Sequence, residues 1–364
     1  MALEVQLKRE VGSRGEAVLR IPDPDYDRHP AYGGAFGLPG LADRVKAVAR
    51  LLPHVGAYAA YDLQSRVRRW RAKPMLAEDS PLYGALTRDG AAGVRFTPPQ
   101  MARIKAAFEP HLAALRTRMA GAAVAAEPAG AEGQGRGSLL RAYRSNGALS
   151  ALQRQLNPSS TWNEAFLHED HARELFAVLR EAFGAQGVLN AASRYQGRPI
   201  DVRYLKLLIN HAGDGWWRAP FADLGLPEPR AVTMHIDHLW TAKAILYLSD
   251  VGERTGPFCY CLGSHRARIG WLEGAIRRAN DRLDRSSCSP AQRRRFYALP
   301  KSLRRKAKFG NDLPDDHPEL ERLLASEKRF GSADGDLILF DDRGMHRGGL
   351  VEEGERCMAQ IRLG

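Results

Sequence analysis

The chain has 364 residues, 44% of them hydrophobic, which is enough to bury a core as one elaborated domain or as two. It opens on the charged stretch MALEVQLKRE and holds no run of 18 apolar residues, so the sequence predicts neither an apolar leader nor a membrane-spanning helix. We therefore expect a cytoplasmic protein with no membrane partner. The formal net charge of +12 points to an anionic partner instead.

The cysteine content argues against a disulfide-based fold. A chain of this size with four cysteines, Cys259, Cys261, Cys288 and Cys357, has too few for a disulfide framework. The C-x-C pair also lacks the second pair that a zinc site needs. We expect reduced and mostly buried thiols.

Residues 1–200 are predicted to form a mainly helical region that flanks the core. An amphipathic helix is expected at about 101–119, and the Gly-rich stretch at about 120–138 is expected to be a flexible loop. The next helix is expected to be capped by Thr161, with Glu164 three residues on, and to end near Gly184. Its apolar positions recur at helical spacing: Ala172, Leu175, Phe176, Leu179 and Phe183.

From residue 201 to 364 the apolar residues alternate with a period near two, and Gly, Pro and Asp interrupt them. Five such runs are predicted to be strands: 202–210, 242–250, 257–263, 336–342 and 356–363. Several short strands in series favour an antiparallel barrel or jelly roll over a parallel sheet.

A basic segment at about 266–330 separates the third and fourth runs and is expected to be a lid-like helical insertion. From Arg266 to Lys308 there are 14 Lys and Arg against three acidic residues. Three interpretations stay open: a solvated helical face, a lid whose arginines bind phosphate or carboxylate groups of a substrate, or a nucleic-acid surface. The interleaved aromatic residues are few for a base-stacking surface: Phe296, Tyr297 and Phe309.

The stretch MHIDHLW, residues 234–240, places His235 and Asp237 two positions apart, so in a strand both side chains point to one face. This pair alone is equally consistent with a structural hydrogen bond. Downstream, the strand at 336–342 is expected to carry His346 at its end, and Arg356 opens the last strand. Two imidazoles and one carboxylate on one face of an octahedral metal leave three positions open, as in non-haem Fe(II) oxygenases.

The ordered pattern H-x-D, G-S-H-R, G-D-x-x-x-F, a distal His and an Arg about ten residues later resembles the phytanoyl-CoA dioxygenase family of Fe(II)/2-oxoglutarate-dependent oxygenases. The matching residues are His235 and Asp237, Gly263 to Arg266, Gly335 and Asp336 with Phe340, His346, and Arg356. The resemblance covers roughly residues 200–364. It implies an α+β fold with a double-stranded β-helix (jelly-roll, cupin-like) catalytic core at 201–364, surrounded by N-terminal helices and the basic helical insertion. His265, within G-S-H-R, is expected to shape a loop near the site rather than bind metal.

The resemblance also implies roles for individual residues. His235, Asp237 and His346 are expected to bind Fe(II), and the planar guanidinium of Arg356 is expected to pair with the distal carboxylate of 2-oxoglutarate. These four residues form the expected catalytic set. Lys206 is a second candidate for holding the cosubstrate, the alternative being a solvated lysine on an edge strand. Halogenating relatives have a small residue where Asp237 stands, so hydroxylation or a related oxidation is favoured over halogenation.

The expected function is therefore that of a dioxygenase using Fe(II), 2-oxoglutarate and O2. It would hydroxylate or otherwise oxidise an unactivated C–H bond of a small or medium-sized anionic or polar metabolite, with decarboxylation of 2-oxoglutarate to succinate. The basic segment favours a phosphorylated, nucleotide or CoA-linked substrate. The alternative is a non-catalytic nucleic-acid-binding protein on the same fold that uses the Arg-rich segment.

Overall fold

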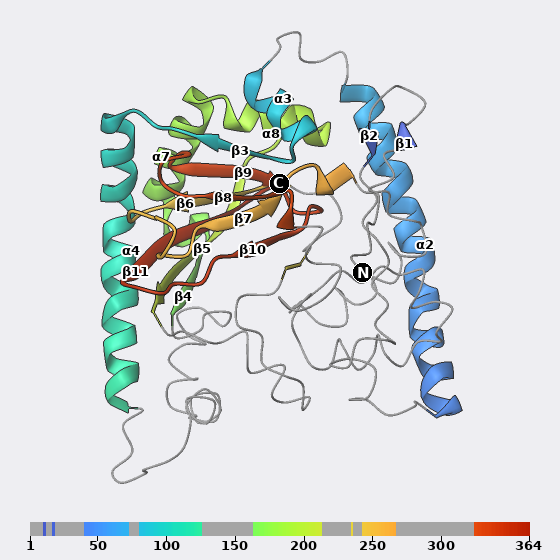
Figure 1. Cartoon of the computed structure of the whole chain (residues 1–364), viewed down its shortest axis with the longest axis horizontal. Helices are drawn as coiled ribbons and strands as arrows, with labels where there is room; N and C mark the ends of the chain where they lie inside the picture. Colours follow the sequence, from blue (N-terminus) through green and yellow to red (C-terminus); the bar gives the residue numbers. More distant parts are fainter. Residues whose placement is uncertain are drawn as a thin grey trace, which may run out of the picture.

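The computed structural model describes residues 10–11, 17–18, 40–72, 80–125, 163–212, 234–235, 242–266 and 324–364. In these ranges, helices surround one six-stranded and one three-stranded sheet, and every strand pairing is antiparallel (Figure 1). A separate pair consists of β1 (Glu10–Val11) and β2 (Ala17–Val18). No helix of the described part of the chain is long and apolar enough to cross a bilayer.

The six-stranded sheet has the strand order β3-β9-β6-β11-β5-β4. Its members are β3 (Ala91–Val94), β4 (Glu164–Leu167), β5 (Val202–His211), β6 (Ala242–Tyr247), β9 (Leu337–Asp341) and β11 (Glu355–Leu363). The three-stranded sheet has the order β10-β7-β8. It consists of β7 (Phe258–Cys261), β8 (Glu327–Phe330) and β10 (His346–Gly348).

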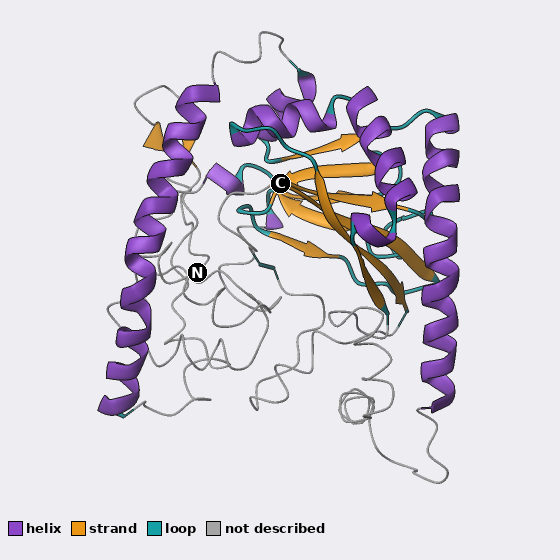
Figure 2. Cartoon of the chain, turned by 180° about the vertical axis from the view of Figure 1, so that it is seen from behind, coloured by secondary structure: helices purple, strands orange, loops and turns teal. Residues whose placement is uncertain are grey.

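The helices differ in how they meet the sheets. Four of them pack on one face of the six-stranded sheet and share a core with it: α3 (Pro81–Arg88), α4 (Pro98–Ala125), α7 (Arg173–Ala185) and α8 (Val188–Gln196) (Figure 2). There are two short 3-10 helices: η1 (Glu169–His171) precedes α7, and η2 (Ser264–Arg266) follows β7. The long helix α2 (Leu41–Ala72) runs along the opposite edge of the molecule from α4.

Strand alternation divides the side chains of the six-stranded sheet between two cores. In β5, Leu205 and Leu207 pack with the helices, whereas Leu208 joins a second core. Residues of both sheets form this second core, among them Phe258 of β7 and Phe340 of β9. We call the sheet faces that line it the inner faces. They matter because the candidate site residues occupy them.

All five strands predicted from apolar runs are confirmed, as β5, β6, β7, β9 and β11. The predicted cap was wrong: Glu164 begins strand β4, and α7 starts only at Arg173. His346 does not end the 336–342 strand, because β9 stops at Asp341 and His346 opens β10 in the other sheet.

Three further predictions concern segments that are only partly described. The helix expected at about 101–119 continues to Ala125, so the first residues of the stretch predicted as a loop at 120–138 are helical. The last residues of the expected insertion at 266–330 form β8, which pairs with β7. The Arg-rich remainder, at 267–323, lies outside the described residues.

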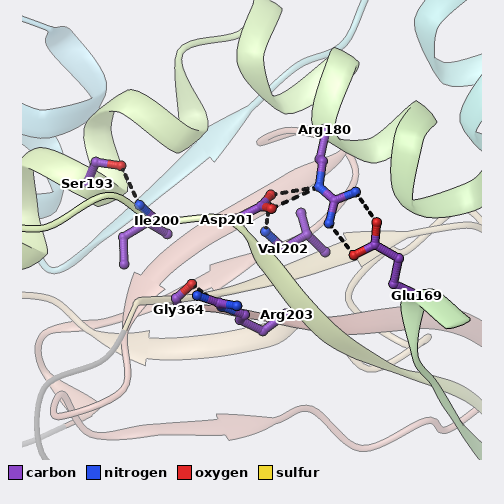
Figure 3. A network of polar contacts seen from close by, with 8 residues as sticks. All are labelled: Glu169, Arg180, Ser193, Ile200, Asp201, Val202, Arg203 and Gly364. Carbon is purple, nitrogen blue, oxygen red and sulfur yellow. Dashed lines mark hydrogen bonds and ion pairs between the residues drawn. The ribbon is translucent and has the colours of Figure 1, made fainter. Parts of the chain in front are cut away.

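A polar network ties helix α7 to one end of the pairing between β5 and β11 (Figure 3). Arg180 donates to Glu169 through both Nη atoms, at 2.6 Å each, and its Nε lies 2.9 Å from both carboxylate oxygens of Asp201. The backbone of Asp201 in turn exchanges hydrogen bonds with Gly364, at 2.9 and 3.3 Å. Arg203 adds a bond of 2.6 Å from its Nε to the Gly364 carbonyl. The network anchors the C-terminal end of β11 beside the start of β5.

The prediction of reduced, buried thiols is confirmed for three of the four cysteines. Cys259, Cys261 and Cys357 are free and buried, and burial raises the pKa of each to about 12. Thiols with such a pKa stay protonated at neutral pH and are poor nucleophiles. Cys288 lies outside the described residues.

The buried His265 is expected to make the folded protein less stable at acidic pH. It is buried in η2, its Nε2 lies 3.0 Å from the Thr87 carbonyl, and burial lowers its pKa below the usual 6.5. Below pH 6.5 the unfolded chain binds a proton here that the folded chain does not, so stability is lost as the pH falls. Urea titrations measure the free energy of unfolding of wild type and of His265→Gln. The advantage of the wild type over the variant should therefore shrink by about 1 kcal/mol when the pH falls from 7.5 to 5.5. Parallel losses in both proteins would contradict this assignment.

Candidate metal centre and cosubstrate site

The two histidines expected to bind metal are held together by their own main chains. His235 and His346 face each other in an isolated antiparallel bridge, with N–H to carbonyl hydrogen bonds of 2.9 Å in one direction and 2.8 Å in the other. Their imidazole centroids are 4.6 Å apart. Two residues that are distant in the sequence thus present their rings side by side.

The environment of His346 selects the tautomer that a metal ligand needs. The ring is buried, and its Nδ1 lies 2.8 Å from the Gly344 carbonyl oxygen. Because a carbonyl only accepts, Nδ1 carries the proton and Nε2 carries the lone pair. The rings of Phe340 and Phe258, with centroids 5.1 and 5.7 Å away, further fix the orientation of the imidazole. This is the usual arrangement around a metal-binding histidine.

The turn between β9 and β10, which delivers His346, is anchored by a buried ion pair. Arg343 Nε lies 2.9 Å from a carboxylate oxygen of Asp341, and Arg343 Nη2 lies 2.9 Å from the hydroxyl of Tyr195 on α8. That hydroxyl also donates to Asp341. Burial disfavours the charge of Asp341, but the neighbouring Arg343 outweighs it and lowers the pKa of this carboxyl. The turn is therefore fixed against the helical layer.

Gly344 sits in this turn where no side chain fits. A Cβ atom there would overlap the hydroxyl of Tyr260 and lie 2.9 Å from Ser264 Oγ. The same Ser264 oxygen accepts the Met345 N–H at 2.8 Å. Any group added at Gly344 must therefore displace the turn or the core next to His346.

We expect Gly344→Ala to destabilise the protein by about 1–3 kcal/mol, as overpacking of a filled core does, and to weaken metal binding at least tenfold, about as much as losing a supporting contact of a ligand. Urea unfolding and an Fe(II) titration measure the two effects. Gly84→Ala in α3 is the matched control, because its Cβ would meet nothing within 4 Å. Equal behaviour of the two variants would refute the steric argument.

Arg356 is buried on the inner face, and the backbone and a neighbouring amide hold its guanidinium. Nη1 donates to the carbonyls of Gly256 and, at 3.2 Å, of Gly349, and Nη2 donates to Asn210 Oδ1 at 3.1 Å. These three acceptors are neutral oxygens. A Cβ built on Gly348 would lie 3.6 Å from Nη2, so the guanidinium packs against the strand that carries His346.

Lys206 lies on the inner face of β5, because it alternates with the outward Leu205 and Leu207. Its Nζ is 3.2 Å from Glu164 Oε2 of β4. The alternative of an edge-strand lysine was wrong, since β5 pairs with both β11 and β4. The role of Lys206 in holding the cosubstrate stays a prediction.

Asp237, the third expected ligand, lies outside the described residues. Within the residues that are described, no group of three or more His, Cys, Asp and Glu side chains is arranged to hold a metal ion. The structure thus describes two of the three expected metal ligands, His235 and His346. Imidazole nitrogens suit iron, zinc, copper and nickel, so a carboxylate is needed to favour iron of the non-haem type.

Two features of the inner face were missed from the sequence. Asn210 pairs with Arg356 in the register between β5 and β11, which only the folded sheet reveals. Lys243 on β6 lies 3.6 Å from a carboxylate oxygen of the fully buried Asp342. Alternation in the run AKAIL placed Lys243 on the face opposite to Ala242 and Ala244, a signal that was available.

Comparisons with known proteins found remote structural likeness only. Neither a family model nor a curated protein matches the chain. AviO1 from Streptomyces viridochromogenes Tue57 is 17% identical over 79% of this chain and 96% of its own, with a TM-score of 0.40. EctD from S. alaskensis, solved with 2-oxoglutarate and 5-hydroxyectoine, is 15% identical over 79% and 76%, with a TM-score of 0.42. SnoK, a non-heme alpha ketoglutarate dependent carbocyclase from nogalamycin biosynthesis, is 14% identical over 79% and 83%, with a TM-score of 0.40.

Proposed function

We propose that this chain is an Fe(II)/2-oxoglutarate-dependent dioxygenase with a double-stranded β-helix core, as its resemblance to the phytanoyl-CoA dioxygenase family implies. The observation that carries the proposal is the reciprocal backbone pairing of His235 with His346, which places two imidazoles with centroids 4.6 Å apart. Solved structures with iron or 2-oxoglutarate occur among the remote structural neighbours, in line with the proposed cofactors.

The residues present fit an iron ion. His235 and His346 would supply two imidazole ligands, and Asp237 a carboxylate that favours iron over metals preferring nitrogen ligands alone. The Gly344 carbonyl holds the proton on Nδ1 of His346, which leaves Nε2 as the ligand atom. When bound, Fe(II) with 2-oxoglutarate and O2 supplies the oxidation of an unactivated C–H bond, while the protein positions the substrate.

Arg356 would bind the distal carboxylate of 2-oxoglutarate. Its guanidinium is fixed by Gly256, Gly349 and Asn210, so it loses little freedom when the cosubstrate arrives. Its burial excludes water and strengthens a charge-assisted hydrogen bond. Lys206 is a further candidate contact for the cosubstrate on the same face.

The oxidation is proposed to be a hydroxylation or a related oxygenation rather than a halogenation, because Asp237 fills the position that halogenating relatives leave small. For the substrate we propose a small or medium-sized anionic or polar metabolite, such as a phosphorylated, nucleotide or CoA-linked compound. The 14 Lys and Arg between Arg266 and Lys308 support this choice by their charge. Nothing in the described part of the chain favours the alternative of a nucleic-acid-binding protein.

The proposal is tested by adding Fe(II) and 2-oxoglutarate to the apoprotein without oxygen. We expect the visible charge-transfer band of a metal-chelated 2-oxo acid, and we expect Asp237→Ala and Arg356→Ala to weaken or abolish it. Circular dichroism shows whether each variant is folded. Absence of the band in a folded wild-type protein, together with failure of both iron and cosubstrate to bind, would overturn the proposal.

A further inference from the structure

Among the residues that the structure describes, large exposed apolar side chains occur in one helix. Throughout the described part of the chain, all those that are exposed belong to α2: Leu41, Val45, Leu52, Leu63, Val67 and Trp70. The two at the ends are the most exposed, Leu41 at 78% and Trp70 at 73%. A scattered apolar residue on a surface needs no explanation, but a contiguous set indicates a contact site.

The six side chains form a single stripe. Successive members are four, seven, eleven, four and three residues apart, so at about 100° per residue they fall within about 80° of the helix circumference. Ala49 and Ala59 are also exposed and lie in the same sector. With 32 residues, α2 is about 48 Å long, and it stands along the edge of the molecule away from the two sheets (Figures 1 and 2).

The charge of α2 decides between possible occupants of the stripe. The helix contains seven Lys and Arg and two Asp, and both its N-terminal and its C-terminal half carry a positive excess. A second copy would therefore place positive charge against positive charge in either orientation, on a chain whose net charge is already +12. An anionic surface has the complementary charge.

A lipid surface also matches the composition of the helix. Helices that lie in the membrane interface combine a Lys- and Arg-rich polar face with an apolar stripe of Leu and Trp. The exposed Arg44 and Lys46 fall on either side of the stripe near its N-terminal end. The expectation of no membrane partner rested on the missing 18-residue apolar run, which bears on a helix that crosses a bilayer but not on one that lies along its surface.

We propose that α2 docks the protein onto an anionic lipid surface, with the stripe in the boundary between headgroups and acyl chains. The exposed Arg44 and Lys46 beside the stripe contact the lipid phosphates. This inference is independent of the proposed oxygenase function, and its test needs no enzymatic activity.

The test is co-sedimentation of the full chain with vesicles. We expect binding to mixed phosphatidylglycerol–phosphatidylcholine vesicles, at least about tenfold weaker binding to phosphatidylcholine alone, and a loss of binding as salt is raised. The variant Leu52→Gln/Leu63→Gln/Trp70→Gln should bind anionic vesicles at least about tenfold more weakly, because it removes apolar area without changing charge. Glutamine is a good helix former, so circular dichroism should show unchanged helicity.

A conservative variant at the same positions, Leu52→Met/Leu63→Met/Trp70→Phe, is the matched control and should bind within about threefold of wild type, since binding scales with apolar area. Failure of the wild type to bind anionic vesicles would overturn the proposal. So would equal binding by the glutamine variant. Sedimentation without lipid shows whether the protein forms dimers. If the wild type dimerises and the glutamine variant does not, the stripe binds a second copy, and lipid docking is overturned.

Discussion

Replacing His346 by alanine is expected to weaken Fe(II) binding more than about 100-fold, because losing a ligand costs more than losing one of its supporting contacts. Its partner ring, His235, would remain in place but would lack the second imidazole 4.6 Å away. Isothermal titration with Fe(II) in the absence of oxygen measures the effect. His346→Gln, which keeps more of the buried volume, should lose metal binding to a similar degree.

His265→Ala is the matched control for this experiment. Both histidines are 4% exposed, so both substitutions leave a buried space of similar size. His265 pairs with the Thr87 carbonyl and is not expected to reach the metal. We expect His265→Ala to lower stability and to keep Fe(II) affinity within about threefold of the wild-type value, since it removes neither a ligand nor a supporting contact. Fe(II) affinity unchanged in the folded His346→Ala variant would remove His346 from the metal site.

The second large effect is expected on 2-oxoglutarate binding by Arg356→Lys, which keeps the positive charge but loses the planar guanidinium group. A lysine ammonium cannot replace two parallel donors, and hydrogen bonds to charged groups contribute about 1.5–3 kcal/mol each. The concentration of 2-oxoglutarate that half-saturates the protein should therefore rise by about 10- to 100-fold, with Fe(II) affinity unchanged. A titration of the charge-transfer band with 2-oxoglutarate measures the first quantity, and an anaerobic calorimetric titration with Fe(II) measures the second.

Arg362→Lys on the same strand provides the comparison. Arg362 lies over the ring of Tyr204, with its guanidinium carbon 5.7 Å from the centroid, and is not part of the expected site. We expect 2-oxoglutarate binding of this variant to match that of the wild type. If both lysine variants weaken cosubstrate binding equally, the effect belongs to strand β11 as a whole rather than to Arg356.

The strands that sequence patterns predicted are those buried on both faces. The runs that became β6 and β9 are mostly apolar and those that became β5 and β11 alternate in part, because helices cover one face of the sheet and the second core covers the other. Short strands such as β8, with the sequence EKRF, and β10, with HRG, carry no such signal. Only their pairing with β7 makes them strands, and pairing partners are not encoded locally.

For the candidate site, the residue identities were predictable from the sequence, but the contacts between them were not. His235, His346 and Arg356 were identified as candidates because their order and residue types match a known chemistry, whatever their spatial positions. The bridge between the two histidines and the hydrogen bond from Arg356 to Asn210 depend on strand register, which the sequence does not reveal. Charge alone did not reveal the partner of Lys206 either, because Glu164 looked like part of a helix cap and lies in β4 instead.

The turn from Asp341 to His346 also limits how such a chain can diverge or be redesigned. On β10, His346 lies opposite Tyr260 and Arg347 lies opposite Cys259, so neighbouring positions face opposite sides of the sheet. Deleting one residue from the turn would rotate the imidazole away from His235 and bring an arginine into its place. An insertion or deletion in this turn would therefore remove the imidazole from its place beside His235, so the number of residues in the turn is itself a functional property.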